Sequence, residues 1–141
     1  MSWNSYELDQ IAQDLVLKAR VRDVDSLNQG HKMRMSMAYG LERFWGEHLR
    51  LSAKAKDKAK ADYWKETWDE LVKVMARAGV KLPNDRVNAK DVTQVRNMSE
   101  KLWGLKTEDQ RISLAVLTQL CDCIVWWTQR YNVEKKNDSN S

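Results

Sequence analysis

The chain has 141 residues, enough for one domain with a substantial core, and a mild net charge of +4. A single proline and five glycines favour helices over hairpins. No uncharged apolar run reaches the roughly 18 residues that cross a membrane, and residues 1–10 lack the basic and apolar regions of a signal peptide. Two cysteines give no disulfide framework, so we expect a reducing, cytoplasmic environment.

The spacing of apolar residues predicts an all-α fold, a single-domain bundle of about five helices. The first helix covers residues 5–22 and begins at Ser5, a suitable N-cap residue. The second covers residues 30–52 and has Gly40 at its middle. Glycine inside a helix costs about 1 kcal/mol relative to alanine, so this position indicates close packing or a kink. Met35 lies off the apolar stripe of the same helix and can cover a partner surface.

The third helix is predicted over residues 56–78, with Trp64 and Trp68 on its inward face, and Gly79 is well suited to terminate it. The fourth is predicted over residues 89–103. With the fifth, the helices complete a single domain over residues 1–131. The polar residues 132–141 are expected to form a disordered tail.

The fifth helix, Thr107–Tyr131, is the longest and the most apolar. Its first residues match a capping box, in which Thr107 accepts from the Gln110 backbone N–H and the Gln110 side chain returns to Thr107. Adjacent tryptophans point about 100° apart on a helix. Trp127 follows the inward stripe, which leaves Trp126 for a partner. The residues predicted to contact a partner are Trp126, Tyr131 and Trp3.

A basic run lies between the second and third predicted helices. Its members are Arg50, Lys54, Lys56, Lys58 and Lys60. Residues 53–62 are the end of the second helix, a solvated connection or the start of the third. Lysine and arginine can contact phosphates, and the aromatics Tyr63, Trp64 and Trp68, if exposed, can stack on unpaired bases. The alternative interpretation is an ordinary solvated surface, because alternating Lys and Ala are typical of one.

Arg43 and His48 have the Arg-x4-His spacing of a helical ribonuclease family, the HEPN family, which their arrangement resembles. Histidine can move a proton near neutral pH, and arginine can stabilise a phosphorane. His48 is also in register with Leu41 and Phe44, so a half-buried core histidine is the simpler interpretation. The ribonuclease is kept as a minor alternative.

No motif predicts a metal or a cofactor. Cys121 and Cys123 lie in one predicted helix with side chains about 200° apart, so they cannot chelate one ion and are expected to be structural. The sequence contains no glycine-rich phosphate loop, paired-carboxylate pocket or nucleophile motif. We therefore expect no catalytic residue, no cofactor and no metal site.

Two segments carry a family resemblance. Residues 38–45 read AYGLERFW and contain a Gly-Leu step followed by an apolar run. The last predicted helix ends in an apolar stretch that leads to Trp, a basic residue and an aromatic, through Leu114, Leu117, Leu120, Ile124, Trp127, Arg130 and Tyr131. Together they resemble the small-subunit family of type III CRISPR effector complexes, the Cmr-type in particular. The likeness covers about half of the chain.

This resemblance implies a non-catalytic α-helical subunit of an RNA-guided antiviral effector complex. Such subunits stack in several copies, contact the other protein subunits and turn a basic face toward the guide and target RNA. The basic run would supply the RNA contacts here, with Arg43 and Arg130 as further candidates. The alternative is a helical protein–protein adaptor, for instance from a phage or mobile element, that binds no nucleic acid.

Overall fold

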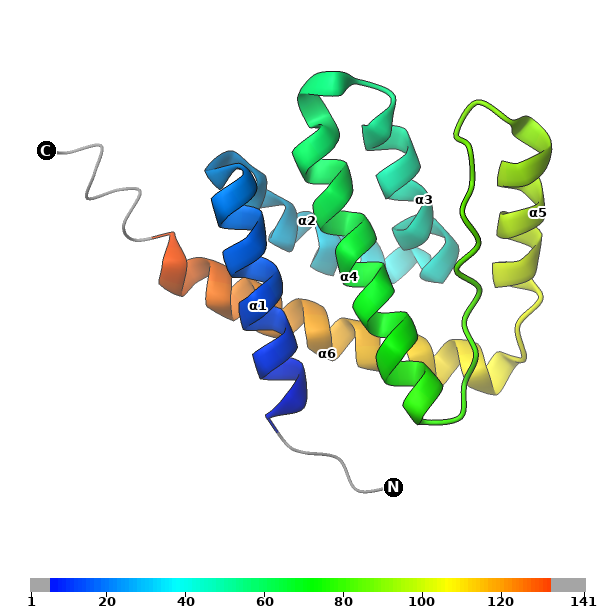
Figure 1. The fold of residues 1–141 in the computed structure, drawn as a ribbon. Helices are drawn as coiled ribbons and strands as arrows, with labels where there is room; N and C mark the ends of the chain where they lie inside the picture. The colour runs from blue at the N-terminus through cyan, green and yellow to red at the C-terminus, as the bar shows by residue number, and fades with distance from the viewer. Residues whose placement is uncertain (1–5, 133–141) are drawn as a thin grey trace, which may run out of the picture.

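The computed structural model describes residues 6–132, and this part of the chain is all-α, as predicted, with six α-helices and no strand (Figure 1). The helices are α1 (Glu7–Arg22), α2 (Gln29–Met35), α3 (Leu41–Ser52), α4 (Lys58–Arg77), α5 (Val92–Trp103) and α6 (Thr107–Tyr131). Three short 3-10 helices join them: η1 (Val24–Asn28), η2 (Ser36–Tyr39) and η3 (Ala55–Asp57). Trp3, the predicted N-cap Ser5 and residues 133–141 of the predicted tail lie outside the described residues.

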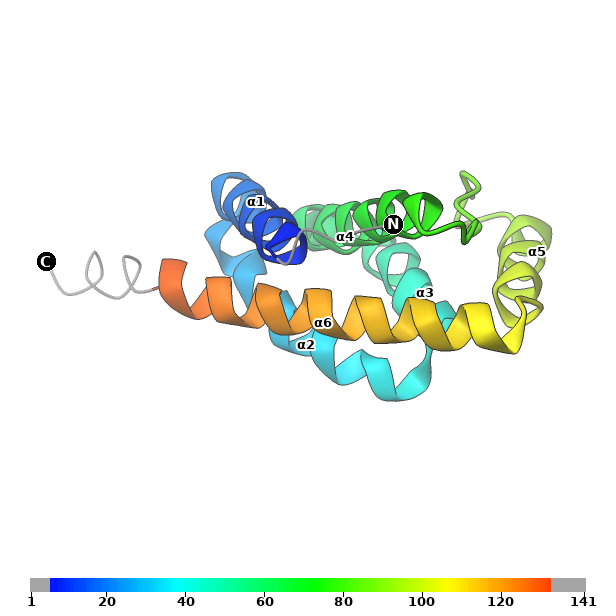
Figure 2. The same cartoon turned by 90° about the horizontal axis from the view of Figure 1, so that it is seen from below.

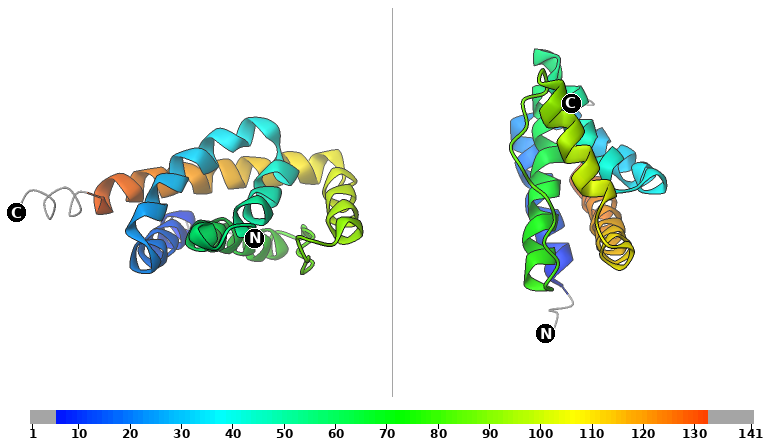
Figure 3. Two further views of the ribbon diagram at one scale, coloured as in Figure 1. Left: turned by 90° about the horizontal axis from the view of Figure 1, so that it is seen from above. Right: turned by 90° about the vertical axis from the view of Figure 1, so that its right-hand side faces the viewer.

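The longest helix, α6, is the element around which the others pack. Figure 2 shows α6 running between α1 and α4 on one side and α2 on the other. The left view of Figure 3 shows α5 at the end of the molecule where α6 begins. α3 packs mainly against α4 and also contacts α5 and α6. One continuous apolar core joins these helices.

α1 packs mainly against α6, and its most deeply buried side chains are small. Ala12, Val16 and Ala19 of α1 are fully buried, as are Leu117 and Ile124 of α6. Small residues let the two helix axes approach, and the branched side chains fill the remaining space.

Among residues 6–132, no helix combines the length and the apolar character that a membrane crossing requires.

The predicted second helix is wrong as a continuous element, because the chain breaks at Gly40. This residue has φ +90° and ψ −178°, a backbone conformation essentially restricted to glycine. No atom outside the neighbouring residues lies within 4 Å of the position that a Cβ would take, so the kink and not close packing requires glycine. The break separates α2 and η2 from α3 and accounts for six helices where about five were predicted.

The capping box predicted for the last helix is also wrong. Lys106 is the N-cap of α6, and no side chain caps this terminus. The Gln110 side chain is used elsewhere: its Nε2 donates to the carbonyls of Leu105, at 2.7 Å, and Trp103, at 3.2 Å. These two carbonyls lie at the corner that follows α5, where the helix no longer supplies partners.

The helix predicted over residues 89–103 corresponds to α5, which begins later than predicted, at Val92, because Asp91 caps it. The Asp91 carboxylate accepts from the backbone N–H groups of Thr93, at 3.1 Å, and Gln94, at 3.2 Å. The Gln94 side chain accepts in turn from the Asn88 backbone N–H at 2.8 Å. Both side chains hold the chain ahead of Val92, so residues 89–91 lie in a turn.

The predicted stop at Gly79 is confirmed. Gly79 has φ +85°, and its N–H donates to the Ala76 carbonyl at 3.1 Å. The Val80 N–H donates to the Met75 carbonyl at 2.9 Å, which completes a Schellman motif. Val80 is buried after this turn, and a later carbonyl, that of Pro83, accepts from Trp68 Nε1 at 3.3 Å. The loop before α5 is therefore fastened along α4.

Candidate nucleic-acid interface

The basic run lies in and beside the turn that joins α3 to α4, at the upper edge of the molecule in Figure 1. We call its five residues the basic turn: Arg50, Lys54, Lys56, Lys58 and Lys60. Arg50 belongs to the last turn of α3, the first two lysines to the connection, and the other two to the first turn of α4. Of residues 53–62, the first five are therefore the connection between α3 and α4, and the last five are the start of α4.

Buried residues on both sides fix this turn. Leu51 at the end of α3 and Ala61 at the start of α4 belong to the core. Between them Lys54 adopts an extended backbone, with φ −120° and ψ 129°, which redirects the chain. The Asp57 N–H then donates to the Lys54 carbonyl at 3.0 Å. The connection is short and hydrogen-bonded, so its lysines stand at defined positions on the surface.

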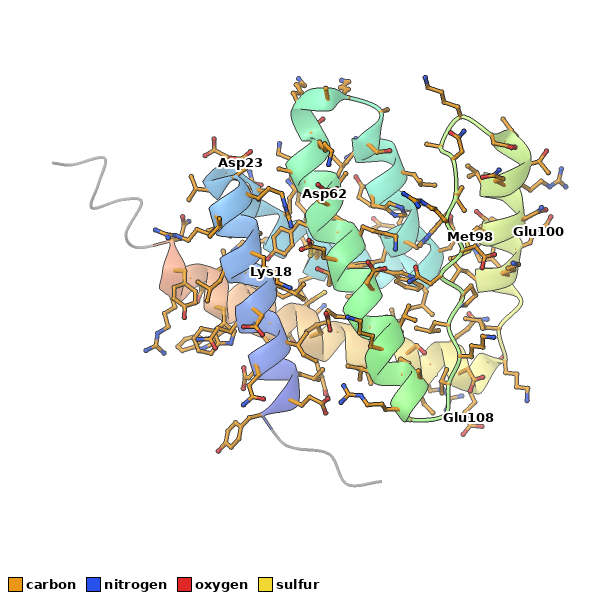
Figure 4. The ribbon with its side chains drawn as sticks, viewed as in Figure 1. Lys18, Asp23, Asp62, Met98, Glu100 and Glu108 are labelled. Carbon is orange, nitrogen blue, oxygen red and sulfur yellow. The ribbon has the colours of Figure 1, made fainter. Side chains whose placement is uncertain are left out.

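Three residues of the basic turn have carboxylate partners. The Arg50 guanidinium donates to Glu47 at 2.5 Å, and this hydrogen bond together with the Glu47 charge raises the arginine pKa. Lys58 pairs with Asp62 at 2.9 Å, one helical turn along α4. Figure 4 labels Asp62 on this helix. Lys60 lies 3.6 Å from Asp57. Such surface pairs contribute only about 0.2–1 kcal/mol each, so a phosphate can compete for the cations.

The remaining two cations are not paired with any described residue. Lys54 and Lys56 are exposed and make no ion pair within residues 6–132. Their charges are therefore the part of the basic turn that is not balanced locally. A polyanion would meet these two ammonium groups first.

The aromatics beside the basic run are core residues and do not form a base-stacking surface. Tyr63, Trp64 and Trp68 are all buried. The Trp64 and Phe44 ring centroids lie 4.8 Å apart, and Trp64 Nε1 donates to the Gln29 side chain at 2.9 Å. Burial also raises the pKa of the Tyr63 phenol. Trp64 and Trp68 both pack against Phe44 of α3, and so they hold α3 and α4 together beneath the basic turn.

Arg43 and His48 lie on different sides of α3. The Arg43 guanidinium stands 5.0 Å above the centre of the exposed Tyr39 ring. His48 is half-buried, packs edge-on against Trp45 at 5.4 Å, and donates through Nδ1 to the Trp45 carbonyl. Burial lowers its pKa. The two side chains therefore do not converge as the ribonuclease alternative requires, and His48 occupies the half-buried position that its register predicts.

The end of α6 carries the other predicted contacts and lies apart from the basic turn (Figure 1). Trp126 is 55% exposed, whereas Trp127 packs against the core, so the predicted orientation of the pair is confirmed. Arg130 lies 5.5 Å over the Trp127 ring. Tyr131 stacks on the same ring at 5.7 Å and accepts from Gln13 Nε2 at 2.8 Å. The fold does not bring Arg130 to the basic turn.

The cysteines lie on α6 without the surroundings of a metal site. Cys121 is buried, and burial raises the pKa of its thiol to about 12. Cys123 is half-buried, with its thiol pKa raised to about 11 mainly by burial. Both thiols are therefore protonated near neutral pH. Within residues 6–132, no group of three or more His, Cys, Asp or Glu side chains could hold a metal ion.

Sequence reasoning missed a second surface, which forms at the kink between α2 and α3. Tyr39 is exposed there beside Met35, and Arg43 covers its ring. The position of Met35 off the apolar stripe was one available signal. Its spacing of four residues from Tyr39 was another, because residues four apart lie on one face of a helix.

Comparisons with protein-family models, with curated proteins and with solved structures found no match to this chain. The resemblance to the CRISPR small subunits thus rests on the two segments described above.

Proposed function

We propose that this protein is a non-catalytic subunit of an RNA-guided, type III CRISPR-like antiviral effector complex, and that its basic turn contacts the RNA backbone. The observation that carries the proposal is the pair of unbalanced cations, Lys54 and Lys56, held on a short hydrogen-bonded turn at one edge of the fold. The resemblance of the two segments supplies the class of assembly.

The character of this surface favours contact with phosphates over recognition of bases. Three further cations of the basic turn have only weak surface partners, which phosphates can replace. The nearby aromatics Tyr63, Trp64 and Trp68 are buried and cannot stack on bases. A surface with cations and no exposed ring binds nucleic acid through its charge, independently of sequence.

Two ammonium groups give weak binding by themselves, so we propose that the contact operates inside an assembly in the cytoplasm. Several copies along one RNA multiply weak contacts through their effective concentration. Trp126 is the candidate contact to another copy or subunit because it is exposed at the far end of α6 from α5. Tyr131 and Trp3 are the other proposed members of that interface.

The proposal is tested by filter binding of the full chain to an RNA duplex of about 20 base pairs across a salt series starting near 50 mM. The test variant is Lys54→Gln/Lys56→Gln, which removes both charges and keeps side-chain length. We expect the slope of log affinity against log salt to decrease by about 1.4 to 1.8, because each phosphate contact contributes about 0.7 to 0.9.

The matched control is Lys81→Gln/Lys90→Gln, which removes two exposed lysines from the loop before α5. Neither lysine has an ion-pair partner among residues 6–132. An equal loss of slope in both double variants would show diffuse attraction to a basic protein and would contradict the assignment of the basic turn.

The second candidate function is the protein–protein adaptor. It is favoured by the carboxylate partners of Arg50, Lys58 and Lys60, which are typical of a solvated surface. If the wild type fails to bind the duplex at low salt and co-purifies with proteins but no protected RNA, the adaptor is supported. Recovery of protected RNA with the chain from its native host supports the effector subunit.

A further inference from the structure

A groove of about 530 Å³ lies beside the kink between α2 and α3. Met35, Ala38 and Tyr39 provide its apolar lining, and Lys32, Arg43 and Glu47 provide its charges. The bend formed by η2 stands outward from the molecule in the left view of Figure 3. This volume falls within the range of ligand-binding clefts. The groove adjoins the basic turn, because its Glu47 pairs with Arg50.

The apolar lining is unusually exposed. Met35 is 74% exposed and Tyr39 is 68% exposed. Single exposed apolar residues are common on protein surfaces, but here two large ones share one groove with an alanine. Methionine adapts to the shape of a partner, and an exposed tyrosine offers a flat apolar face. The lining therefore suits apolar side chains from another molecule.

The charges around the groove are not balanced. Lys32 and Arg43 have no carboxylate partner among residues 6–132. The Glu47 carboxylate is engaged by Arg50 at 2.5 Å. Two cations are thus left for an incoming negative charge, one on α2 and one on α3.

The groove is formed before any partner arrives. Met33 and Met37, on the inner side of the same segment, are buried in the core. Ser36 Oγ donates to the Met33 carbonyl at 2.7 Å, and the Arg43 guanidinium rests on the Tyr39 ring. Because the backbone of the walls is already ordered, binding costs little further backbone entropy.

We propose that this groove binds an amphipathic, acidic helix of a partner protein. Apolar side chains one helical turn apart on that helix contact Met35 and Tyr39, and its carboxylates pair with Lys32 and Arg43. The charges favour a peptide over RNA, because a carboxylate needs one cation, whereas a phosphate backbone would meet only two cations beside a carboxylate. A predominantly apolar lining points to the same occupant.

The test is selection from a displayed library of helical peptides of about 16 residues, which span about 24 Å, against the immobilised full chain. Counter-selection uses Met35→Ser/Tyr39→Ser, a variant of exposed residues whose folding is checked by circular dichroism and thermal melting. We expect the enriched peptides to combine apolar residues one turn apart with Asp or Glu, and to bind this variant at least about tenfold more weakly. Val21→Ser/Val92→Ser changes exposed apolar residues elsewhere and should leave affinity unchanged.

A charge exchange makes the test specific. Arg43→Glu should weaken an enriched acidic peptide by about tenfold, and replacing the facing peptide Glu by Lys should restore binding to this variant. Enrichment of basic peptides, or equal binding to wild type and to Met35→Ser/Tyr39→Ser, would overturn the proposal.

Two further outcomes would assign the groove to other occupants. If the groove variant loses RNA affinity and the library yields no acidic binder, the groove is a nucleic-acid surface. If the variant changes the sedimentation of the chain in the absence of peptide, the groove is an interface between copies. Either result contradicts an acidic partner helix.

Discussion

Gly40 lies at a kink and Gly46 lies inside a helix, and glycine has opposite effects on the free energy of unfolding at these two positions. Gly40 adopts a backbone conformation that residues with a Cβ rarely adopt. Gly46 lies inside α3, where its flexibility in the unfolded chain works against folding. An added Cβ there would lie 3.4 Å from Glu42 Oε2, the far end of a flexible side chain. The same substitution therefore distinguishes a required glycine from a tolerated one.

We expect Gly40→Ala to lower the free energy of unfolding by about 1–3 kcal/mol through backbone strain. Gly46→Ala should raise it by about 0.5–1 kcal/mol through helix propensity. Urea unfolding of the two variants and the wild type measures both changes. A loss of similar size in both variants would show that packing around α3, and not the conformation of Gly40, controls the result.

His48 is the residue through which stability should respond to pH. Burial favours the neutral ring and lowers the folded-state pKa below the ordinary value of 6.5, with Lys65 acting in the same direction and Asp69 against it. As pH falls below 6.5 the unfolded histidine takes up a proton before the folded one does. The free energy of unfolding therefore falls until the pH reaches the lowered folded-state pKa.

Replacing His48 by Gln removes this contribution. We expect the wild type to lose more stability than His48→Gln when the pH is lowered from about 7.5 to about 5.5, a range in which histidine is the side chain that normally titrates. Parallel urea titrations at the two pH values measure the difference. Equal losses in both proteins would place the pH response on other groups.

Asp91 and Thr107 are both of the residue types that cap helix N-termini, but only Asp91 forms a cap in the structure. Asp91 caps α5 through two backbone N–H groups, whereas no side chain caps α6. Thr107 resembles an N-cap residue in sequence, yet the N-cap lies one residue earlier, at Lys106, whose carbonyl accepts from the Gln110 N–H at 2.9 Å. A capping pattern identifies the neighbourhood of a helix start and leaves open which residue provides the cap.

Asp91→Ala should therefore destabilise the protein by about 1 kcal/mol, the usual cost of losing an N-cap. Thr107→Ala should change stability by less than about 0.5 kcal/mol, as expected for an exposed residue without a structural bond. Thermal melting of the two variants tests the contrast. Greater damage from Thr107→Ala would show that the capping box forms in solution.

The elements also show which features could be predicted from sequence. Both ends of α6, and the C-terminal ends of α1, α3 and α5, agree with the apolar period and its breakers. The apolar period gave no sign of the break at Gly40, because the apolar stripe continues on both sides of it. The glycine itself indicated close packing or a kink and left the choice between them open. Local periodicity reports which residues face the core and not whether the axis between two turns is straight.

Across the whole molecule, Trp126 at the C-terminal end of α6 lies apart from the other two candidate surfaces. The basic turn at the α3–α4 edge (Figure 1) adjoins the groove at the α2–α3 kink, because Arg50 of the turn pairs with Glu47 of the groove. The basic turn was predictable as a charged surface from the lysine spacing. Its ion pairs depend on side-chain geometry and did not follow from the run itself. The burial of Trp64 and Trp68 agrees with the inward face that the helical spacing predicted for them.

The central position of α6 affects how the protein is made. α1 leaves the ribosome long before α6, because the residues from Arg22 to Tyr131 take about 5 to 20 seconds to add at usual rates of synthesis. During that interval side chains of α1 that are buried in the folded protein, among them Val16 and Ala19, lack the cover of α6. This part of the core therefore stays exposed until α6 has been made and has left the ribosome, and a chaperone has that interval in which to bind it.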